Sequence, residues 1–399
     1  MLYADHAATS PVRREVLEAM APYLSGVFGN PSSHHTVGEA AAGALEDARS
    51  RVAAVLGMRA GDVVFTSGGT EANNLAVKGI VLASGRRHLI TTPIEHESIL
   101  ESAAYLQRFH DVKVTLLPVT ATGRVEPEVL VAAVRPDTAL VSIGHANNEI
   151  GTVQDVAEIA ARLADGGANR DWRTTRDDVA RRTRDRPPSG RTVPLHIDAV
   201  QSAGWLPLAG LRADAISIAG HKLGAPKGIG ALAVRGRVPL EPLLHGGGQE
   251  RGRRSGTENV AAAVGLAVAL ELAEAERTAS ADLVRERTAA FIAAVLRLVP
   301  QAALTGDPDR RLPATASFTF NGVSGESVLL ELERRGVVSS SGSACAAGSD
   351  DPSHVLVACG IDPVVAQTSV RFTFGRAPLE QPEALAALVA ESVTAVSGL

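Results

Sequence analysis

A chain of 399 residues, 45% hydrophobic and 21% charged, is long enough for two or more packed units and has the composition of a globular protein. Its formal net charge of −5 gives no reason to expect nucleic acid as the main ligand. Only two cysteines occur, Cys345 and Cys359, which excludes a disulfide-dense scaffold and a four-cysteine zinc site.

The first residues of the chain have neither the basic region nor the apolar region of a signal peptide. The longest apolar stretch, residues 260–270, is shorter than the roughly 20 residues that a membrane span requires. We therefore expect a cytoplasmic protein that does not bind the membrane.

Short apolar runs alternate with helical patterns through the first two-thirds of the chain. Most of these runs are nearly continuous, which is typical of strands buried on both faces of a parallel sheet covered by helices. This pattern predicts an α/β fold. Strands are expected at residues 63–66, 88–92, 112–119, 139–144, 195–198 and 215–219, with helices from residue 71 and at 153–164.

Residues 168–191 interrupt this alternation with a sequence rich in Arg and Asp and nearly free of apolar side chains. Such a segment cannot bury enough surface to offset the entropy lost on ordering, so we expect a disordered insertion. An electrostatic docking arm for an acidic partner or RNA is the functional alternative.

After residue 259 the pattern changes to longer helices, expected at 260–275 and 282–298, followed by a strand at 314–320 and a helix at 326–335. We therefore expect a small α+β domain over residues 260–399 and a large domain over residues 15–259. Residues 1–14 are expected to pack with the small domain.

Asp198 and Lys222 each follow an apolar run, at the strand ends where open α/β sheets bind ligands. A structural ion pair is one interpretation. The other is a lysine that forms a Schiff base with pyridoxal phosphate, with the acid facing the ring nitrogen.

Residues 67–70, Ser-Gly-Gly-Thr, lie between a strand and a helix, where backbone N–H groups and the Thr70 hydroxyl would face an anion. A plain helix cap would use the same residues. His96 and Asn147 also follow expected strands. His96 could stack on a flat cofactor, or it could serve a structural role. Asn147 could bond a carboxylate or a ring oxygen.

Cys345 lies in a small, polar stretch at residues 339–351, which is typical of an exposed loop. That setting favours a reactive thiol, with an inert loop cysteine as the alternative. Cys359 has apolar neighbours and is interpreted as packing. Arg371 lies on an expected strand, where it would either hold a carboxylate through paired hydrogen bonds or face the surface.

Nine motifs occur in order: DHAATSP (5–11), GNPSS (29–33), FTSGGTEANN (65–74), HANNEIG (145–151), DAVQS (198–202), GHKLGAPKGIGAL (220–232), HGGGQERGRRSGTEN (245–259), SSGSACAAG (340–348) and SVRFTFGR (369–376). Together they resemble the cysteine desulfurases, in the aminotransferase class V branch of the fold-type I pyridoxal-phosphate enzymes. The resemblance covers nearly the whole chain.

The resemblance implies a pyridoxal 5′-phosphate site. Lys222 would form the Schiff base, Asp198 would pair with the ring nitrogen, Gln201 would bond the ring hydroxyl, His96 would stack on the ring, and Gly69, Thr70 and His221 would hold the phosphate. Ala219 stands where the family usually has a serine that bonds the phosphate.

The resemblance also implies a homodimer, in which Thr257 reaches the phosphate of the neighbouring subunit's cofactor. Asn147 and Arg371 would hold the carboxylate of L-cysteine, and Cys345 would take its sulfur as a persulfide, leaving L-alanine. The sulfur would then pass to an acceptor protein that serves iron–sulfur cluster, tRNA or other thio-cofactor synthesis. A selenocysteine lyase or a class V aminotransferase is the alternative.

Overall fold

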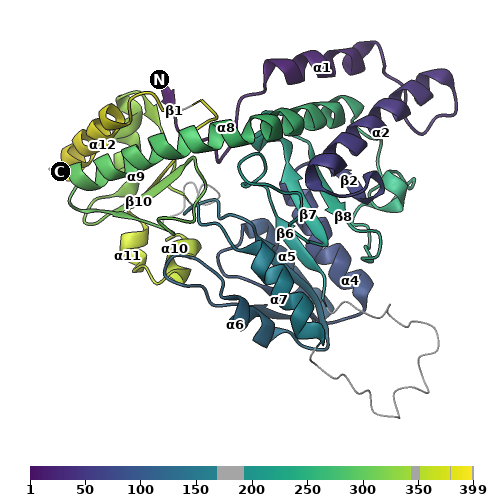
Figure 1. Ribbon diagram of the computed structural model, residues 1–399, viewed down its shortest axis with the longest axis horizontal. Coiled ribbons are helices and arrows are strands. Elements are labelled where there is room, and N and C mark those ends of the chain that lie inside the picture. The colour runs from purple at the N-terminus through teal and green to yellow at the C-terminus, as the bar shows by residue number, and fades with distance from the viewer. Residues whose placement is uncertain (169–192, 343–350, 378, 398–399) are drawn as a thin grey trace.

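The computed structural model describes residues 1–168, 193–342, 351–377 and 379–397, and its main feature is a seven-stranded sheet (Figure 1). Five neighbouring strands are parallel, and β8 runs antiparallel to both β2 and β7. The strand order is β2 (Val63–Thr66), β8 (Gly230–Val234), β7 (Ala215–Ala219), β6 (Leu195–Asp198), β5 (Thr138–Gly144), β3 (His88–Thr91) and β4 (Lys113–Leu116).

Helices cover both faces of this sheet, because its central strands are apolar on both sides. One face packs against α2 (Thr36–Leu56), α6 (Pro127–Ala133), α7 (Val156–Ala168) and the first half of α8, with α1 (Arg14–Ser25) further out. The other face packs against α5 (Glu97–His110) and a continuous helical run made of α3 (Gly69–Asn74), a π-helical turn (Leu75–Gly79) and α4 (Ile80–Ser84). The predicted α/β class is confirmed.

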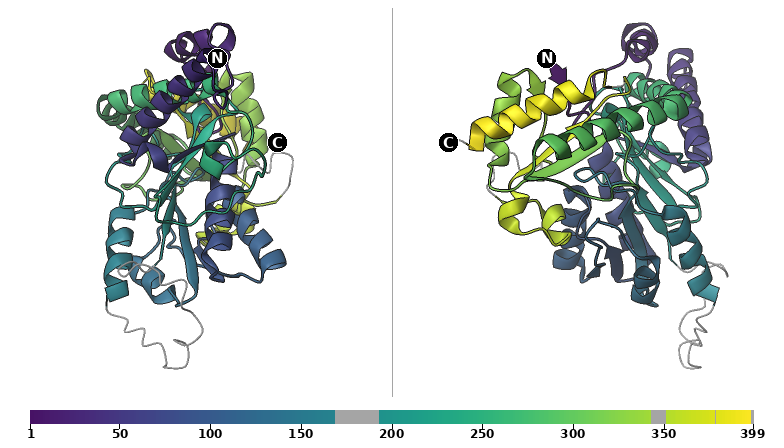
Figure 2. Two further views of the ribbon diagram at one scale, coloured as in Figure 1. Left: turned by 90° about the vertical axis from the view of Figure 1, so that its right-hand side faces the viewer. Right: turned by 60° about the vertical axis from the view of Figure 1, so that its left-hand side comes forward.

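Helix α8 (Val260–Leu298) is a single helix of 39 residues, which corrects the prediction of two helices at 260–275 and 282–298. The six residues between those two segments are four polar residues and two alanines, with no glycine or proline, so nothing in them ends a helix. The first half of α8 packs against the main sheet. Its second half, which includes Val284 and Phe291, belongs to a second core (Figures 1 and 2).

The second core lies around a three-stranded antiparallel sheet in the order β12 (Ser369–Thr373), β10 (Thr315–Phe320) and β9 (Ala302–Leu304). Phe291 of α8 packs edge-on against Phe318 and Phe372, with α9 (Gly325–Arg334) and α12 (Pro382–Ser397) covering the sheet. The N-terminal strand β1 (Leu2–Tyr3) pairs in parallel with β11 (Val337–Val338), so the start of the chain is held against this core.

The remaining elements are short. One-turn 3₁₀ helices lie at Ala60–Asp62, Gly220–Lys222 and Glu250–Gly252, and two short helices, α10 (His354–Ala358) and α11 (Pro363–Ala366), precede β12. The expected insertion at 168–191 lies, apart from its first residue, outside the described residues. Within the described ranges, none of the helices has both the length and the apolar content needed to cross a membrane.

Candidate active site

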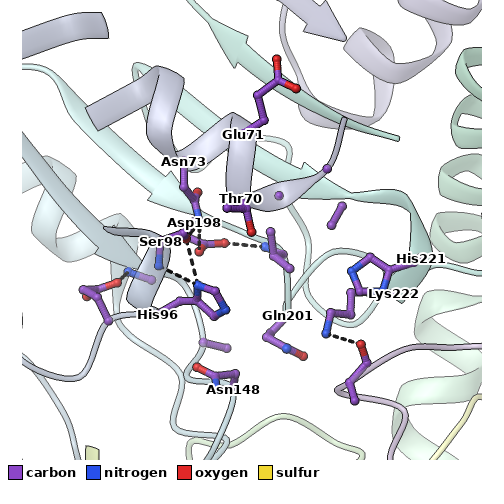
Figure 3. Close-up of a pocket in the computed structure, with 18 of the residues that line it drawn as sticks. Thr70, Glu71, Asn73, His96, Ser98, Asn148, Asp198, Gln201, His221 and Lys222 are labelled. Atoms are coloured by element: carbon purple, nitrogen blue, oxygen red, sulfur yellow. Dashed lines mark hydrogen bonds between the residues drawn. The ribbon is translucent and has the colours of Figure 1, made fainter. Parts of the chain in front are cut away.

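A cavity of about 600 Å³ opens at the carboxyl ends of the parallel strands. Asp198 ends β6, Lys222 follows β7 by one 3₁₀ turn, and His96 follows β3, so the sheet itself brings these three residues together (Figure 3). Eight of the residues predicted to bind cofactor or substrate line this cavity: Gly69, Thr70, His96, Asn147, Asp198, Gln201, His221 and Lys222. Arg371 and Thr257 do not line it, and Cys345 lies outside the described residues.

The N-terminal segment holds the amino group of Lys222 at the cavity wall. Lys222 Nζ donates to the backbone oxygen of Ala7 and, at 2.8 Å, to that of Ala8. Gln201 Nε2 donates to the same Ala7 oxygen at 3.1 Å. The segment that begins at β1 therefore passes over the turn after β7 and fixes the direction of both side chains, which no local sequence pattern indicates.

Asp198 is a buried carboxyl held by two donors. Its Oδ1 accepts from the Val200 N–H at 2.9 Å and its Oδ2 from Asn73 Nδ2 at 2.7 Å. Burial raises the pKa of Asp198, while these two hydrogen bonds and the charges of His96 and Lys222 act in the opposite direction. A cation placed against this carboxyl would complete its pairing.

His96 caps α5 and presents one ring nitrogen to the cavity. Its Nδ1 accepts the Ser98 N–H at 3.0 Å and lies 2.8 Å from the Ser98 hydroxyl. Because a backbone N–H can only donate, Nδ1 is the acceptor, and the neutral ring carries its proton on Nε2. The cap fixes the plane of the imidazole beside Asp198 (Figure 3).

The turn after β2 is shaped to admit an anion. A Cβ placed on Gly69 would lie 2.7 Å from Val200 Cγ2, so only glycine lets the backbone approach this closely. Thr70 follows at the start of the helical run, and His221 lines the cavity on the other side. Burial and the nearby charges of Lys222 and Lys227 lower the pKa of His221 to about 4, so its ring is neutral at pH 7.

The polar side chains of the cavity wall that were not expected from the sequence include Asn73, Ser98 and Glu95. Asn73 lies one helical turn after Thr70, so the helical spacing would have placed it on the same face. Glu95 is buried and accepts from the Thr92 hydroxyl at 2.7 Å and from the Gly144 N–H at 2.8 Å. Burial raises the pKa of Glu95 to about 8.

Asn147 and Arg371 already have partners in the protein. Asn147 Nδ2 donates to the Ile94 oxygen at 2.8 Å, and its Oδ1 accepts the N–H groups of Glu149 and Ile150. Arg371 is buried, and its Nη2 lies 2.7 Å from Asp5 Oδ1. Its Nε is buried without a hydrogen-bond partner among the described residues.

Thr257 is exposed and lines a smaller hollow outside the main cavity. The hollow and the cavity share Ser67 and Gly228, so they lie next to each other. In the described part of the chain, Thr257 does not line the cavity that Lys222 lines.

Comparisons with known proteins identify the family of the chain. The family described as aminotransferase class-V matches residues 2–169 and 189–381. The chain is 40% identical over 378 residues to a cysteine desulfurase IscS of Dictyoglomus turgidum, covering 94% of this chain and 89% of that protein. It is 41% identical over 395 residues to an IscS-like cysteine desulfurase of Mycobacterium tuberculosis, covering 95% and 93%.

Solved structures show the same likeness. A NifS-like protein superimposes with a TM-score of 0.85 at 33% identity, over 100% of both chains. DndA from Streptomyces lividans superimposes with a TM-score of 0.71 at 34% identity, over 92% of this chain and 97% of that one. A structure titled SspA in complex with cysteine gives a TM-score of 0.76 at 33% identity, over 95% and 100%.

Fold, site and relatives together define an enzyme of the aminotransferase class-V family. Within that family the chain belongs to the cysteine desulfurases. The resemblance carried by the nine motifs is thereby confirmed. A selenocysteine lyase or a class V aminotransferase is not favoured, since relatives that match nearly the whole chain are named cysteine desulfurases.

Proposed function

We propose that the chain binds pyridoxal 5′-phosphate at Lys222 and converts L-cysteine to L-alanine, with Cys345 receiving the sulfur. The observation that carries the proposal is that a lysine amine, a buried carboxyl and a capped imidazole face one cavity beside a glycine turn. These are the groups that an aromatic aldehyde with a basic ring nitrogen and a phosphate requires.

The residues of the cavity fit that cofactor group by group. Lys222 would hold it covalently, and Asp198 would face the ring nitrogen, where a protonated ring would offset the cost of burying the carboxylate. His96 would stack on the ring and Gln201 would bond the ring hydroxyl. The phosphate would lie at the turn of Gly69 and Thr70 with a neutral His221 as a further donor, and Ala219 adds no hydroxyl there.

When bound, pyridoxal phosphate supplies an electron sink that weakens bonds near the substrate's α-carbon. Lys222, once its amine is free, moves the proton at that carbon. The Cys345 thiolate attacks the substrate sulfur, so that an S–S bond forms and the C–S bond breaks. The β-carbon keeps the bonding electrons and takes up the proton that the Cys345 thiol gave up, which leaves L-alanine and one persulfide.

The substrate carboxylate would be held by Asn147 and Arg371. Asn147 lines the cavity, while Arg371 is tied to Asp5 and lies just behind the wall, so binding would require the guanidinium to share its donors between two carboxylates. The unpartnered Nε of Arg371 is the donor still open for this. The SspA structure in complex with cysteine supports cysteine as the substrate class.

A homodimer is part of this proposal. Thr257 is exposed and does not line its own cavity, so it would contribute to the phosphate site of a second copy. Leu17, Leu24 and Phe28, on and just after α1, are exposed apolar side chains of the kind that a partner would cover. The persulfide would pass its sulfur to an acceptor protein that serves iron–sulfur cluster, tRNA or other thio-cofactor synthesis.

Two variants test the proposal. Lys222→Ala should abolish the visible absorbance of covalently held cofactor and the formation of alanine from cysteine. Cys345→Ala should keep that absorbance but form neither alanine nor the protein persulfide seen by mass spectrometry. Normal alanine formation by Cys345→Ala would show that Cys345 is not the sulfur acceptor.

A further inference from the structure

Glu149 bonds the chain on one side of the segment that carries Cys345 and lies close to the chain on the other side. It lies in the loop after β5 and is 4% exposed. On one side, the Ser353 hydroxyl donates to Glu149 Oε2. On the other, a Cβ placed on Gly342 would lie 3.6 Å from the same oxygen. Gly342 and Ser353 are separated in sequence by ten residues, eight of which, 343–350, lie outside the described residues.

The loop that carries Glu149 is fixed to the cavity wall. The Glu149 N–H donates to Asn147 Oδ1 at 2.8 Å, and Asn147 in turn bonds the Ile94 oxygen. Arg371 Nη1 donates to the Asn148 oxygen at 2.7 Å and to the Gly342 oxygen at 3.4 Å. The backbone of this loop is therefore bonded both to the cavity wall and to Arg371, which also bonds Gly342.

The chain after the segment is held at two points. Ser353 caps α10 by accepting the Leu356 N–H at 3.2 Å while its hydroxyl hydrogen goes to Glu149. His354 Nε2 donates to the Glu95 oxygen at 3.1 Å, next to His96. Glu149 is thus the side chain that ties the start of α10 to the loop of Asn147.

The charges around Glu149 are mixed. Burial and the negative charge of Glu97 raise the pKa of Glu149, whereas the Ser353 hydrogen bond and the charges of His354 and Arg371 lower it. Either protonation state of the carboxyl keeps an oxygen that accepts from Ser353, so the contact depends on the geometry of the side chain.

We propose that Glu149 is a positioning residue for sulfur transfer: it bonds Ser353 and lies close to Gly342, and so helps to fix the described chain on either side of residues 343–350, next to the cavity wall. This rests on the proposed function, in which Cys345 takes the sulfur. Sulfur transfer needs the thiolate within bonding distance of the substrate sulfur, so a small shift of these two points lowers the rate of that step. Asn147, which would hold the substrate carboxylate, is bonded by the backbone N–H of Glu149, and a substitution of the Glu149 side chain keeps that N–H.

The test uses the cofactor-loaded enzyme and the variant Glu149→Ala. We expect kcat for alanine formation, and the single-turnover rate of persulfide formation on Cys345, to fall about tenfold, as for loss of one buried hydrogen bond. The KM for cysteine should stay within about threefold of the wild-type value, and the cofactor spectrum should not change. The chemistry before sulfur transfer uses other residues. Glu149→Gln, which keeps an acceptor oxygen, should recover most of the rate.

Ser353→Ala provides the second variant. It should lower kcat in the same way, and the double variant should be no slower than the slower single one, because the two residues act through one contact. Glu101→Ala, an exposed acid on α5, is the matched control and should behave as wild type. Should Glu149→Ala fail to fold or lose cofactor, Ser353→Ala decides the question, because it removes the donor of the same hydrogen bond.

Normal kcat in Glu149→Ala or Ser353→Ala, or a KM effect without a kcat effect, would overturn the role of Glu149. Independent, multiplying effects of the two substitutions would do the same. These results differ from a failure of the proposed function, which would appear as normal turnover in Cys345→Ala whatever Glu149 does.

Discussion

Asn73 Nδ2 donates to Asp198 Oδ2 at 2.7 Å and to the Ser98 hydroxyl at 3.0 Å, and so joins the helical run after the anion turn to the end of β6 (Figure 3). Asp198 is the carboxyl that would face the cofactor ring nitrogen, and Ser98 is the partner of His96. One amide therefore orients both groups that flank the proposed ring.

Removing the Asn73 amide should weaken cofactor binding. Asn73→Ala takes a donor from a buried carboxylate, so the pKa of Asp198 rises further and its anionic form is held less well. We expect the dissociation constant of pyridoxal phosphate to rise about tenfold or more, measured by spectroscopic titration. Asn74→Ala removes an amide that bonds only the backbone, at Thr70 and Ser98, and should stay within about threefold. Equal effects of the two substitutions would contradict the role of Asn73.

Adding a hydroxyl at Ala219 should strengthen phosphate binding. Ala219 ends β7, and a Cβ placed on Gly69 would lie 3.2 Å from the Ala219 Cβ, so a serine there would stand beside the anion turn. Ala219→Ser should lower the dissociation constant of pyridoxal phosphate about two- to tenfold, the value of one hydrogen bond. The affinity of Ala219→Ser for pyridoxal, which lacks the phosphate, should equal that of wild type. An equal gain in affinity for pyridoxal would show that the new hydroxyl does not bond the phosphate.

Glu95 should make the stability of the cofactor-free protein depend on pH. Its pKa rises from 4.5 to about 8 on folding, so between these values the folded state holds a proton that the unfolded chain has lost. The contribution of Glu95 to the free energy of unfolding is fully present below pH 4.5 and is lost as the pH rises through about 8. Glu95→Gln cannot ionise, so its melting temperature should fall less than that of wild type as the pH rises from about 6 to about 8.5. Thermal melting curves recorded at intervals of about 0.5 pH units would measure this. Parallel melting curves at all pH values would contradict this.

The buried pair of Arg49 and Glu250 should stabilise the fold near Thr257. Arg49 Nη1 lies 2.6 Å from Glu250 Oε2, which also accepts the Phe65 N–H at 2.9 Å. Arg49→Met leaves the Glu250 carboxylate unpaired, and the free energy of unfolding should fall by about 3–5 kcal/mol in denaturant titrations. Adding Glu250→Gln removes the stranded charge and keeps an acceptor for Phe65, so the double variant should be more stable than Arg49→Met alone.

Much of the main sheet follows from local sequence. The runs at 63–66, 195–198 and 215–219 match β2, β6 and β7. A short, continuous apolar run between polar turns is buried most completely as a strand of a sheet that helices cover on both faces. Strand β8 was not predicted, since a Gly- and Pro-rich stretch leads into it. The strand expected at 112–119 is shortened to β4, Lys113–Leu116, a partly exposed edge strand.

The start of α7 shows how tertiary contacts move an element boundary. The helix was expected from residue 153 and begins at Val156, after Asp155, whose Oδ1 accepts the Glu158 N–H at 3.2 Å. Val153 and Thr152 instead form bridges with Ala146 and Arg311. Those bridges join the loop of Asn147 to the residues before β10, and nothing in a helical pattern reveals them.

By itself the sequence determined that Asp198, Lys222 and His96 would meet, because residues at the carboxyl ends of parallel strands share one edge of the sheet. Tertiary structure alone decided which polar groups complete them. Asn73 reaches Asp198 across 125 residues and Ser353 reaches Glu149 across 204, and both contacts depend on how helices and loops pack on the sheet. Local periodicity fixes the face of a helix or strand on which a side chain lies. A buried hydrogen bond also requires that the faces of two elements lie within bonding distance of each other, and the packing of the whole chain sets that distance.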